Sequence, residues 1–440
     1  IRTTGSQYIY AGHDAANPAA TGDITISGGT GLNASAEIWA GSTQELGYSY
    51  NYYYYRPTRD VIISGGTGDG ATATAHAGNN QYIYGSGTFA VRGGAGAGAS
   101  AIVESGNRQE VGVDSSGSYR MFGRAEVLAG SGGIARLVST GNQEVYASGD
   151  IVVTGGSGAD MTASIESTGG NQTIGTSYNY YGSTDPTDNI TVQGGTGTGA
   201  AAFISASTGQ TVHAGGAITL TGGASGANAL LSTTSGQQYV GFTATGYSNY
   251  YSYYYNNTES ITVTAAPGAN ARITSGGTQI LQSSGDISFT SSTGATAQAS
   301  AGTGQTVLTY QAINLTGGAD SGTGADATGL LVKTSGNQSL TVGTGITMTG
   351  GTGATDVLIQ NAGAGSQSVA TGGAISLLAG GASSGDVAID AAGNQTINAG
   401  TSILLQASGA GSNAVAIDAG GSQTVSAGTT IALDNAAAAT

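Results

Sequence analysis

Apolar residues alternate with polar ones in short runs along the chain, and glycine or small polar residues separate the runs. One segment contains three such runs, at Gln395–Ile397, Ile403–Leu405 and Val415–Ile417. Alternation with a period of two predicts β-strands, and no window shows the spacing of an amphipathic helix. The pattern therefore predicts an all-β chain that is built from short strands.

A glutamine signature, Gln-x-(Ile/Val/Leu), marks the repeat. It reads Gly-Asn-Gln-Thr-Ile from Gly393 to Ile397 and Gly-Ser-Gln-Thr-Val from Gly421 to Val425. The later copies are 28 or 29 residues apart, and a fixed period of this size is typical of a solenoid. The 14 copies place their glutamines at Gln7, Gln44, Gln81, Gln109, Gln143, Gln172, Gln210, Gln238, Gln279, Gln305, Gln338, Gln367, Gln395 and Gln423.

Three strands per repeat, with no second type of element, predict a parallel β-helix of about 14 three-stranded coils of about 28 residues, right-handed by default. Gln395 and Ile397 point to the same side of their strand, so burying the isoleucine also buries the glutamine. We expect the stacked amides to form a hydrogen-bonded ladder. Double glycines after the second strand, as at Gly65–Gly66, predict a corner with positive φ.

The repeat runs nearly from end to end, which predicts a single solenoid domain over 1–440. Coils in 1–275 carry long insertions and those in 276–440 are regular. All five insertions follow the glutamine strand, and after the first coil they occur in every second coil. Of the 23 tyrosines, 16 lie in the insertions.

Tyrosine offers rigid, amphipathic contact area, so the insertions are predicted to pack laterally against other molecules or to bind a surface. The other interpretation is that they fold onto the flank of the rod as a local cover. The aromatic residues predicted to interact are Tyr48, Tyr50, Tyr52, Tyr53, Tyr54, Tyr55, Tyr119, Phe122, Tyr178, Tyr180, Tyr181, Tyr247, Tyr250, Tyr251, Tyr253, Tyr254 and Tyr255.

Composition narrows the possible functions. Charged residues make up 8% of the chain and the net charge is −15, a composition that disfavours nucleic-acid binding. Through residue 140 there are 8 basic and 10 acidic residues, a net of −2; from 141 onward there are 2 and 15, a net of −13. There is no cysteine for a disulfide or a thiolate metal site. No apolar run approaches the ~20 residues of a membrane span.

Residues that could carry chemistry are scattered. His13, His76 and His213 lie in different coils without a matching nucleophile and carboxylate, so a catalytic triad is not expected. The pair Asp185 and Asp188 is better explained as a solvated loop. We therefore predict that the protein is not an enzyme and has no catalytic, cofactor-binding or metal site.

An arginine-rich region and a glycine-rich segment each allow two interpretations. Arginines concentrate in coils 3 to 5, where we expect Glu104, Glu110 and Glu126 to balance them, with a small anion site as the alternative. The segment Gly155–Asp160 matches the start of a calcium-binding nonapeptide but occurs once. The arginines are Arg92, Arg108, Arg120, Arg124 and Arg136.

Both ends of the chain fall within a coil. Ile1–Gln7 matches Val332–Gln338, so the chain starts in the third strand of a coil, and it stops soon after the second strand at Ile431–Leu433. Bare β-helix ends expose unpaired strands and normally need caps. We expect either a segment of a longer protein or another copy that continues the stack head to tail.

The repeats from about 304 to 433, with Gly-Asn-Gln-Ser-Leu at Gly336–Leu340, resemble the repeat regions of filamentous-haemagglutinin-like bacterial exoproteins of the two-partner-secretion or autotransporter type. This resemblance implies a secreted, cell-surface β-helix that acts in adhesion or as an extracellular fibre.

The expected function is that of a structural subunit of an extracellular filament. Its partners would be copies of itself, stacked end to end, with the tyrosine-rich loops packing laterally. The alternative is an adhesin stalk that binds surface glycans through these loops, and the remote alternative is a polysaccharide-active enzyme.

Overall fold

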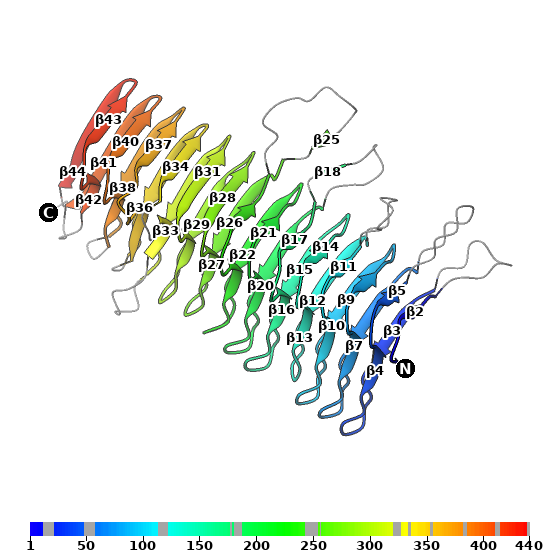
Figure 1. Cartoon of the computed structure of the whole chain (residues 1–440). Coiled ribbons are helices and arrows are strands. Elements are labelled where there is room, and N and C mark those ends of the chain that lie inside the picture. Colours follow the sequence, from blue (N-terminus) through cyan, green and yellow to red (C-terminus); the bar gives the residue numbers. More distant parts are fainter. Residues whose placement is uncertain are drawn as a thin grey trace. The chain divides into compact units, whose positions relative to one another are not determined.

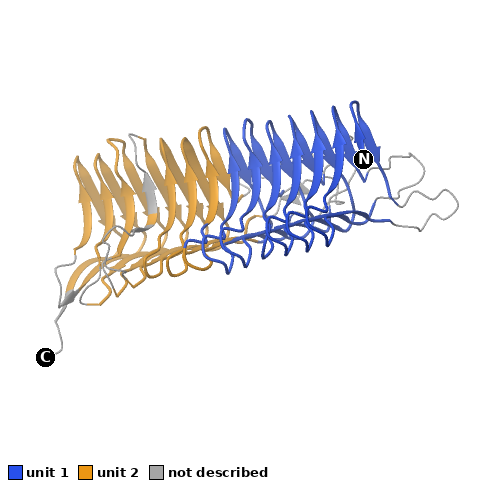
Figure 2. Cartoon of the chain, turned by 90° about the horizontal axis from the view of Figure 1, so that it is seen from below, with its two compact units in different colours: residues 1–216, 226–228, 244–256 blue, residues 217–225, 229–243, 257–440 orange. Residues whose placement is uncertain are grey.

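The computed structural model describes residues 1–11, 22–47, 58–112, 122–176, 178–179, 187–242, 254–255, 257–319, 327–332, 336–352, 355–381, 385–409 and 414–437. The chain divides into two compact units (Figure 2). Unit 1 comprises 1–216, 226–228 and 244–256, and unit 2 comprises 217–225, 229–243 and 257–440.

Each coil contributes three strands, and equivalent strands of successive coils pair in parallel (Figure 1). The strand that begins at or just before the signature glutamine belongs to sheet B, the next strand belongs to sheet C, and the third belongs to sheet A. In unit 1, sheet B consists of β2 (Gln7–Ile9), β5 (Gln44–Leu46), β8 (Gln81–Ile83), β11 (Gln109–Val111), β14 (Gln143–Val145), β17 (Gln172–Ile174) and β21 (Gln210–Val212).

The other two sheets of unit 1 follow the same order. Sheet C consists of β3 (Ile24–Ser27), β6 (Val61–Ser64), β9 (Thr88–Arg92), β12 (Arg124–Leu128), β15 (Ile151–Thr154) and β19 (Ile190–Gln193). Sheet A consists of β1 (Arg2–Thr3), β4 (Ala36–Ala40), β7 (Ala73–Ala77), β10 (Ala101–Ser105), β13 (Ala135–Ser139), β16 (Ala163–Ser167) and β20 (Ala202–Ala206).

Unit 2 repeats the arrangement with longer strands. Sheet B consists of β24 (Gln238–Val240), β28 (Thr278–Ser283), β31 (Gly304–Thr309), β34 (Gln338–Val342), β37 (Gln367–Thr371), β40 (Gln395–Ala399) and β43 (Gln423–Ala427). Sheet C consists of β22 (Ala217–Thr221), β26 (Ser260–Thr264), β29 (Ile287–Thr290), β32 (Ala312–Thr316), β35 (Gly345–Thr349), β38 (Ala374–Leu378), β41 (Ser402–Gly409) and β44 (Thr430–Ala437). Sheet A consists of β23 (Ala229–Thr233), β27 (Ala271–Ser275), β30 (Ala297–Ala301), β33 (Ala327–Val332), β36 (Asp356–Asn361), β39 (Val387–Ala391) and β42 (Val415–Ala419).

The strand register places like residues on like residues. Gln109 lies opposite Gln81 on one side and Gln143 on the other. Along β15, Ile151 and Val153 are fully buried while Val152 faces outward and is only half-buried, as the alternation of a strand requires. The inward positions thus form continuous aliphatic columns that exclude water from the interior.

The predicted all-β parallel β-helix is confirmed, and the described residues contain no helix. Consistently, no helix among them is long and apolar enough to traverse a bilayer. The handedness and the single-domain organisation stay predictions.

The paired glycines at the corner after sheet C have a different cause from the one predicted. Gly65 and Gly66 are not among the residues with positive φ. Instead, a Cβ on Gly65 would overlap the carbonyl oxygen of Ala99, and one on Gly66 would overlap that of Gly29. Glycine is required there because the backbones of neighbouring coils approach closely.

Candidate functional site

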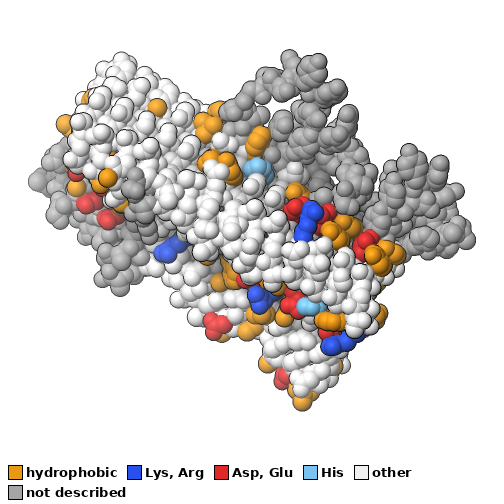
Figure 3. All heavy atoms as spheres, viewed as in Figure 1, with side chains coloured by type: hydrophobic (Ala, Val, Ile, Leu, Met, Phe, Trp, Pro, Cys, Tyr) orange, Lys and Arg blue, Asp and Glu red, His pale blue; other side chains and the backbone are white. Residues whose placement is uncertain are grey.

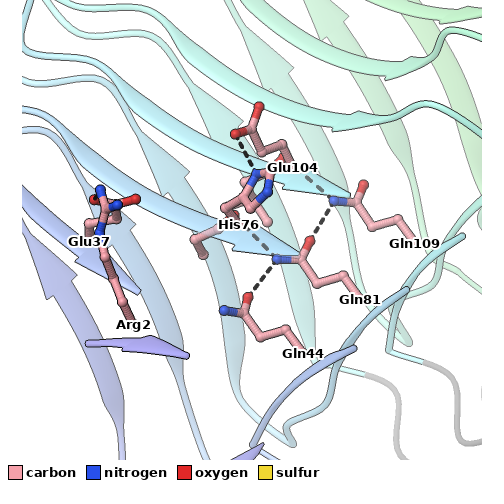
Figure 4. Close-up of polar contacts among 9 residues, drawn as sticks. Arg2, Glu37, Gln44, His76, Gln81, Glu104 and Gln109 are labelled. Atoms are coloured by element: carbon pink, nitrogen blue, oxygen red, sulfur yellow. Dashed lines mark hydrogen bonds and ion pairs between the residues drawn. The ribbon is translucent and has the colours of Figure 1, made fainter. Parts of the chain in front are cut away.

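The signature glutamines of unit 1 form a hydrogen-bonded ladder inside the coils, part of which Figure 4 shows. In every pair, Nε2 of the glutamine in the later coil donates to Oε1 of the glutamine before it. The six N···O distances are 2.6–2.9 Å. The ladder comprises Gln7, Gln44, Gln81, Gln109, Gln143, Gln172 and Gln210.

Unit 2 contains a second ladder with the same direction. Its six N···O distances are 2.7–2.8 Å. The glutamines joined by these bonds are Gln238, Gln279, Gln305, Gln338, Gln367, Gln395 and Gln423.

The amide nitrogen also donates to the backbone of the neighbouring sheet A strand. Nε2 of Gln143 donates to the carbonyl of Leu137 at 3.2 Å, and Nε2 of Gln395 donates to that of Ile389 at 3.0 Å. Both carbonyls belong to the sheet A strand that precedes the glutamine. An unpaired buried amide is costly, so a partner for each of its hydrogens is what permits a glutamine column in an apolar interior. The amides all point the same way, which gives each ladder a direction.

The corner after sheet B carries the insertions, and one position there distinguishes the coils. Three residues after the signature glutamine, four of the five coils with an insertion have glycine, and the coil that follows each of these four has a large side chain. The first coil is the exception and has Tyr10 at this position. The glycines are Gly47, Gly112, Gly175 and Gly241, with φ of 82°, 83°, 70° and 78°. The large residues of the coils that follow each of them are Tyr84, Tyr146, His213 and Gln282.

Two independent constraints require glycine at this position. A positive φ disfavours any other residue. In addition, a Cβ on Gly112 would overlap the carbonyl oxygen of Tyr146, and one on Gly175 would overlap that of His213. The glycine therefore turns the chain out of the coil while the next coil passes directly against it.

A buried threonine closes the insertion where the chain re-enters the coil. In coil 6, the Thr187 amide donates to the Thr176 carbonyl at 3.0 Å, and the Thr176 amide donates to Thr187 Oγ1 at 3.1 Å. Thr187 Oγ1 in turn donates to the carbonyl of Ala147 at 2.7 Å. Thr258 makes the same two bonds with Phe242 in coil 8, at 2.8 and 3.0 Å. We did not predict these threonines from the sequence, although each lies three residues before the first inward residue of sheet C.

Phe122 occupies this closing position in coil 4, and its predicted role is wrong. Its side chain is fully buried and packs against Phe89, with ring centroids 5.7 Å apart. Its backbone forms a parallel bridge with Ala147. Phe122 is therefore a core residue that seals the base of the insertion, and it is not available as an interaction residue.

The tyrosine insertions of coils 6 and 8 meet through their backbones. Tyr178–Asn179 (β18) pairs antiparallel with Tyr254–Tyr255 (β25), and Tyr178 lies opposite Tyr255. The other predicted interaction tyrosines lie outside the described residues: Tyr48, Tyr50, Tyr52, Tyr53, Tyr54, Tyr55, Tyr119, Tyr180, Tyr181, Tyr247, Tyr250, Tyr251 and Tyr253.

A charged cluster lies on the outer face of sheet B in unit 1. Nη2 of Arg108 is 2.8 Å from Oε2 of Glu110 and 3.2 Å from Oε1 of Glu144. Glu110 is fully buried and accepts a 3.3 Å hydrogen bond from the Tyr84 hydroxyl. Burial, with the charges of Glu144 and Glu110, raises the pKa of Tyr146. Arg108 thus neutralises two carboxylates on adjacent coils that would otherwise repel each other.

The other predicted arginine partners are confirmed in part. Arg92 and Arg124 both contact Glu126, and the Arg124 contact is 3.1 Å. Arg136 pairs with Glu166 at 3.1 Å, which the sequence did not indicate.

Glu104 balances a histidine instead of an arginine. It contacts Nδ1 of His76 at 2.7 Å, as Figure 4 shows, and the His76 ring stacks on Trp39 with centroids 5.7 Å apart. Figure 3 shows such charged side chains as small groups on a largely uncharged surface.

The remaining candidate residues are not gathered into one site. Burial lowers the pKa of His213 to about 4, so this imidazole is neutral at pH 7. Asp160 lies in a turn with a φ of 59°, and His13 and Asp185 lie outside the described residues. Within the part of the chain that the structure describes, no three His, Asp or Glu side chains lie together as potential metal ligands.

Comparison with known proteins adds no relative. No family model, curated protein or solved structure matches the chain.

Proposed function

We propose that the chain is a non-enzymatic structural subunit of an extracellular fibre, in which β-helices stack end to end. The directional glutamine ladder carries the proposal. Each coil offers Oε1 to the next coil and Nε2 to the previous one, so any further coil of the same kind extends the ladder without a new type of contact. The resemblance of the repeats to secreted bacterial exoproteins supports the extracellular location.

The first and last described coils have the same three-strand pattern, so their stacking surfaces match each other. Ile431 and Leu433 on β44 are 51% and 79% exposed, whereas the equivalent Ile403 and Leu405 on β41 are 0% and 9% exposed. A second copy placed with β1, β2 and β3 on β42, β43 and β44 would continue all three sheets. Gln7 would then donate to Gln423. Such a contact is heterologous and does not close, so it generates a filament.

Assembly of the purified chain tests this proposal. We expect concentration-dependent filaments in sedimentation and negative-stain microscopy. Leu433→Lys places a charge in the stacking face and should leave monomers, while Thr396→Lys, on the exposed outer side of β40, should assemble as the parent does. Monomers at every concentration of the parent protein would refute the stacking.

An adhesin stalk is the second candidate, and the β18–β25 pairing favours it. That pairing joins two tyrosine-rich insertions that are separated by 75 residues or more in sequence, since Tyr178 lies opposite Tyr255. Aromatic side chains are common in surfaces that recognise ligands. Replacing both insertions with glycine-serine links should abolish binding to immobilised glycans and leave assembly intact. Loss of assembly instead would assign the insertions to lateral packing.

A further inference from the structure

Five consecutive coils of unit 2 repeat one motif in sheet C, and its outward positions form a regular array. The motif is an isoleucine, a small polar residue, an apolar residue and a threonine. It reads Ile218–Thr221, Ile261–Thr264, Ile287–Thr290, Ile313–Thr316 and Ile346–Thr349. The isoleucine and the apolar residue are buried, at no more than 1% exposure, and the polar pair faces outward.

The strand register aligns these polar residues into two straight columns. Thr221 pairs with Thr264, Thr264 with Thr290, Thr290 with Thr316, and Thr316 with Thr349. The second column is Thr219, Thr262, Ser288, Asn314 and Thr347. Hence one column is threonine in all five coils, and the other carries a hydroxyl or an amide in each.

The geometry of the sheet fixes the spacing of the array. Adjacent strands are about 4.8 Å apart, and alternate residues of a parallel strand are about 6.6 Å apart. The array is therefore a rectangular lattice about 20 Å long in which each threonine presents a hydroxyl and a methyl group. The glutamine ladder lies inside the same coils and holds them in register, which favours a flat sheet.

Among the described residues, no side-chain hydrogen bond involves the threonine hydroxyls of this array. None of its eight threonines hydrogen-bonds through its side chain to another described residue, and each is part-exposed. No member of the array is itself charged, although Asn314 donates to the Asp286 carboxylate at 3.5 Å. On the same sheet in unit 1, by contrast, Arg92 and Glu126 occupy outward positions of the two columns. The outer face of sheet B in unit 2 has only one comparable column, because its second outward column is mixed. The hydroxyl column is Thr306, Ser339, Ser368, Thr396 and Thr424, and the mixed column is Gln282, Leu308, Thr341, Ala370 and Asn398. A single hydroxyl column is within the general strand preference for threonine, so the pair of adjacent columns is what distinguishes sheet C.

We propose that this threonine array is a water-ordering surface that binds the face of an ice crystal. A lattice of hydroxyl and methyl groups with these two spacings is close to the arrangement of water oxygens on a prism plane of ice. The hydroxyls can join the crystal's hydrogen-bond network, and the methyl groups favour an ordered water layer around them. A charged group would disrupt that layer, which fits the composition of the array. The proposal is independent of whether the chain forms filaments.

Partition into slowly grown ice tests the proposal with the full chain. We expect the protein to be enriched in the ice fraction and to inhibit recrystallisation. Thr264→Lys/Thr316→Lys should lose both activities because two exposed ammonium groups interrupt the lattice. The matched control is Thr306→Lys/Thr341→Lys, which places the same charges at exposed positions of sheet B. Circular dichroism and urea unfolding confirm that all forms are folded. Exclusion of the parent protein from ice would overturn the proposal, as would an equal loss of activity in the control.

Discussion

Replacement of Gln143 by leucine tests the energetic role of the ladder. Gln143 donates to Gln109 Oε1 at 2.6 Å and accepts from Gln172 Nε2 at 2.7 Å. The substitution leaves one buried acceptor, on Gln109, and one buried donor, on Gln172, without these partners. An orphaned buried polar group costs about 1–3 kcal/mol, and the extra apolar side chain offsets part of this, so we expect a net loss of roughly 2–4 kcal/mol.

The double variant Gln109→Leu/Gln143→Leu gives a sharper result. It also leaves two orphaned groups, now Oε1 of Gln81 and Nε2 of Gln172. The number of unsatisfied groups therefore equals that of either single variant, and the double loss should fall below the sum of the single losses by about 2 kcal/mol.

Urea unfolding followed by circular dichroism measures these losses, and hydrogen exchange of the β11, β14 and β17 amides localises them. Gln311→Leu is the control, since this glutamine is exposed and lies outside the ladder, and its loss should be under about 1 kcal/mol. Strict additivity of the two single variants would contradict a cooperative ladder, because it would mean that the amides act independently.

Three further substitutions test the loop-bearing corner. Gly112→Ala combines a positive φ with overlap on the Tyr146 carbonyl, so it should lower the melting temperature more than Gly98→Ala does. Gly98 has a φ of 73°, but no atom lies within 4 Å of a Cβ added there. Equal effects of the two substitutions would show that the close approach of the Tyr146 carbonyl is unimportant. Phe122→Ala should lower the free energy of unfolding, measured in urea, by about 3–5 kcal/mol because it removes a fully buried aromatic side chain. A loss under about 1 kcal/mol would show that Phe122 is not a core residue. His213 has its pKa lowered to about 4 by burial, so the unfolded chain binds a proton first as the pH falls below about 6.5. The fold should thus lose roughly 1–3 kcal/mol between pH 7 and pH 4, and His213→Gln should remove this part of the pH dependence; an unchanged profile would contradict the burial of a neutral imidazole.

The sequence predicted the fold well because its period is explicit. Gln395 and Ile397 alternate with Thr396, so a buried isoleucine implies that the glutamine side chain also points inward. Stacking of equivalent glutamines in successive coils then predicts the hydrogen-bonded ladder. The predicted partners of Arg108 and Arg124 were found because each pairs with a glutamate close to it in sequence or on an adjacent coil.

Other features depend on contacts that no single repeat contains. Phe122 seemed to belong to an insertion, and only the packing of Phe89 from the previous coil shows that it is core. Gly65 and Gly66 suggested a positive φ, whereas glycine is required at these positions because the backbone of the neighbouring coils leaves no room for a Cβ. The threonine columns were visible as a sequence motif, but their meaning required the register between strands.

Electron cryomicroscopy of the purified chain tests the proposed end-to-end stacking most directly. We expect continuous filaments with an axial rung spacing of about 4.8 Å, in which the three sheets run without interruption from one copy into the next. Isolated rods of single-chain length, with no end-to-end contacts at any concentration, would contradict it.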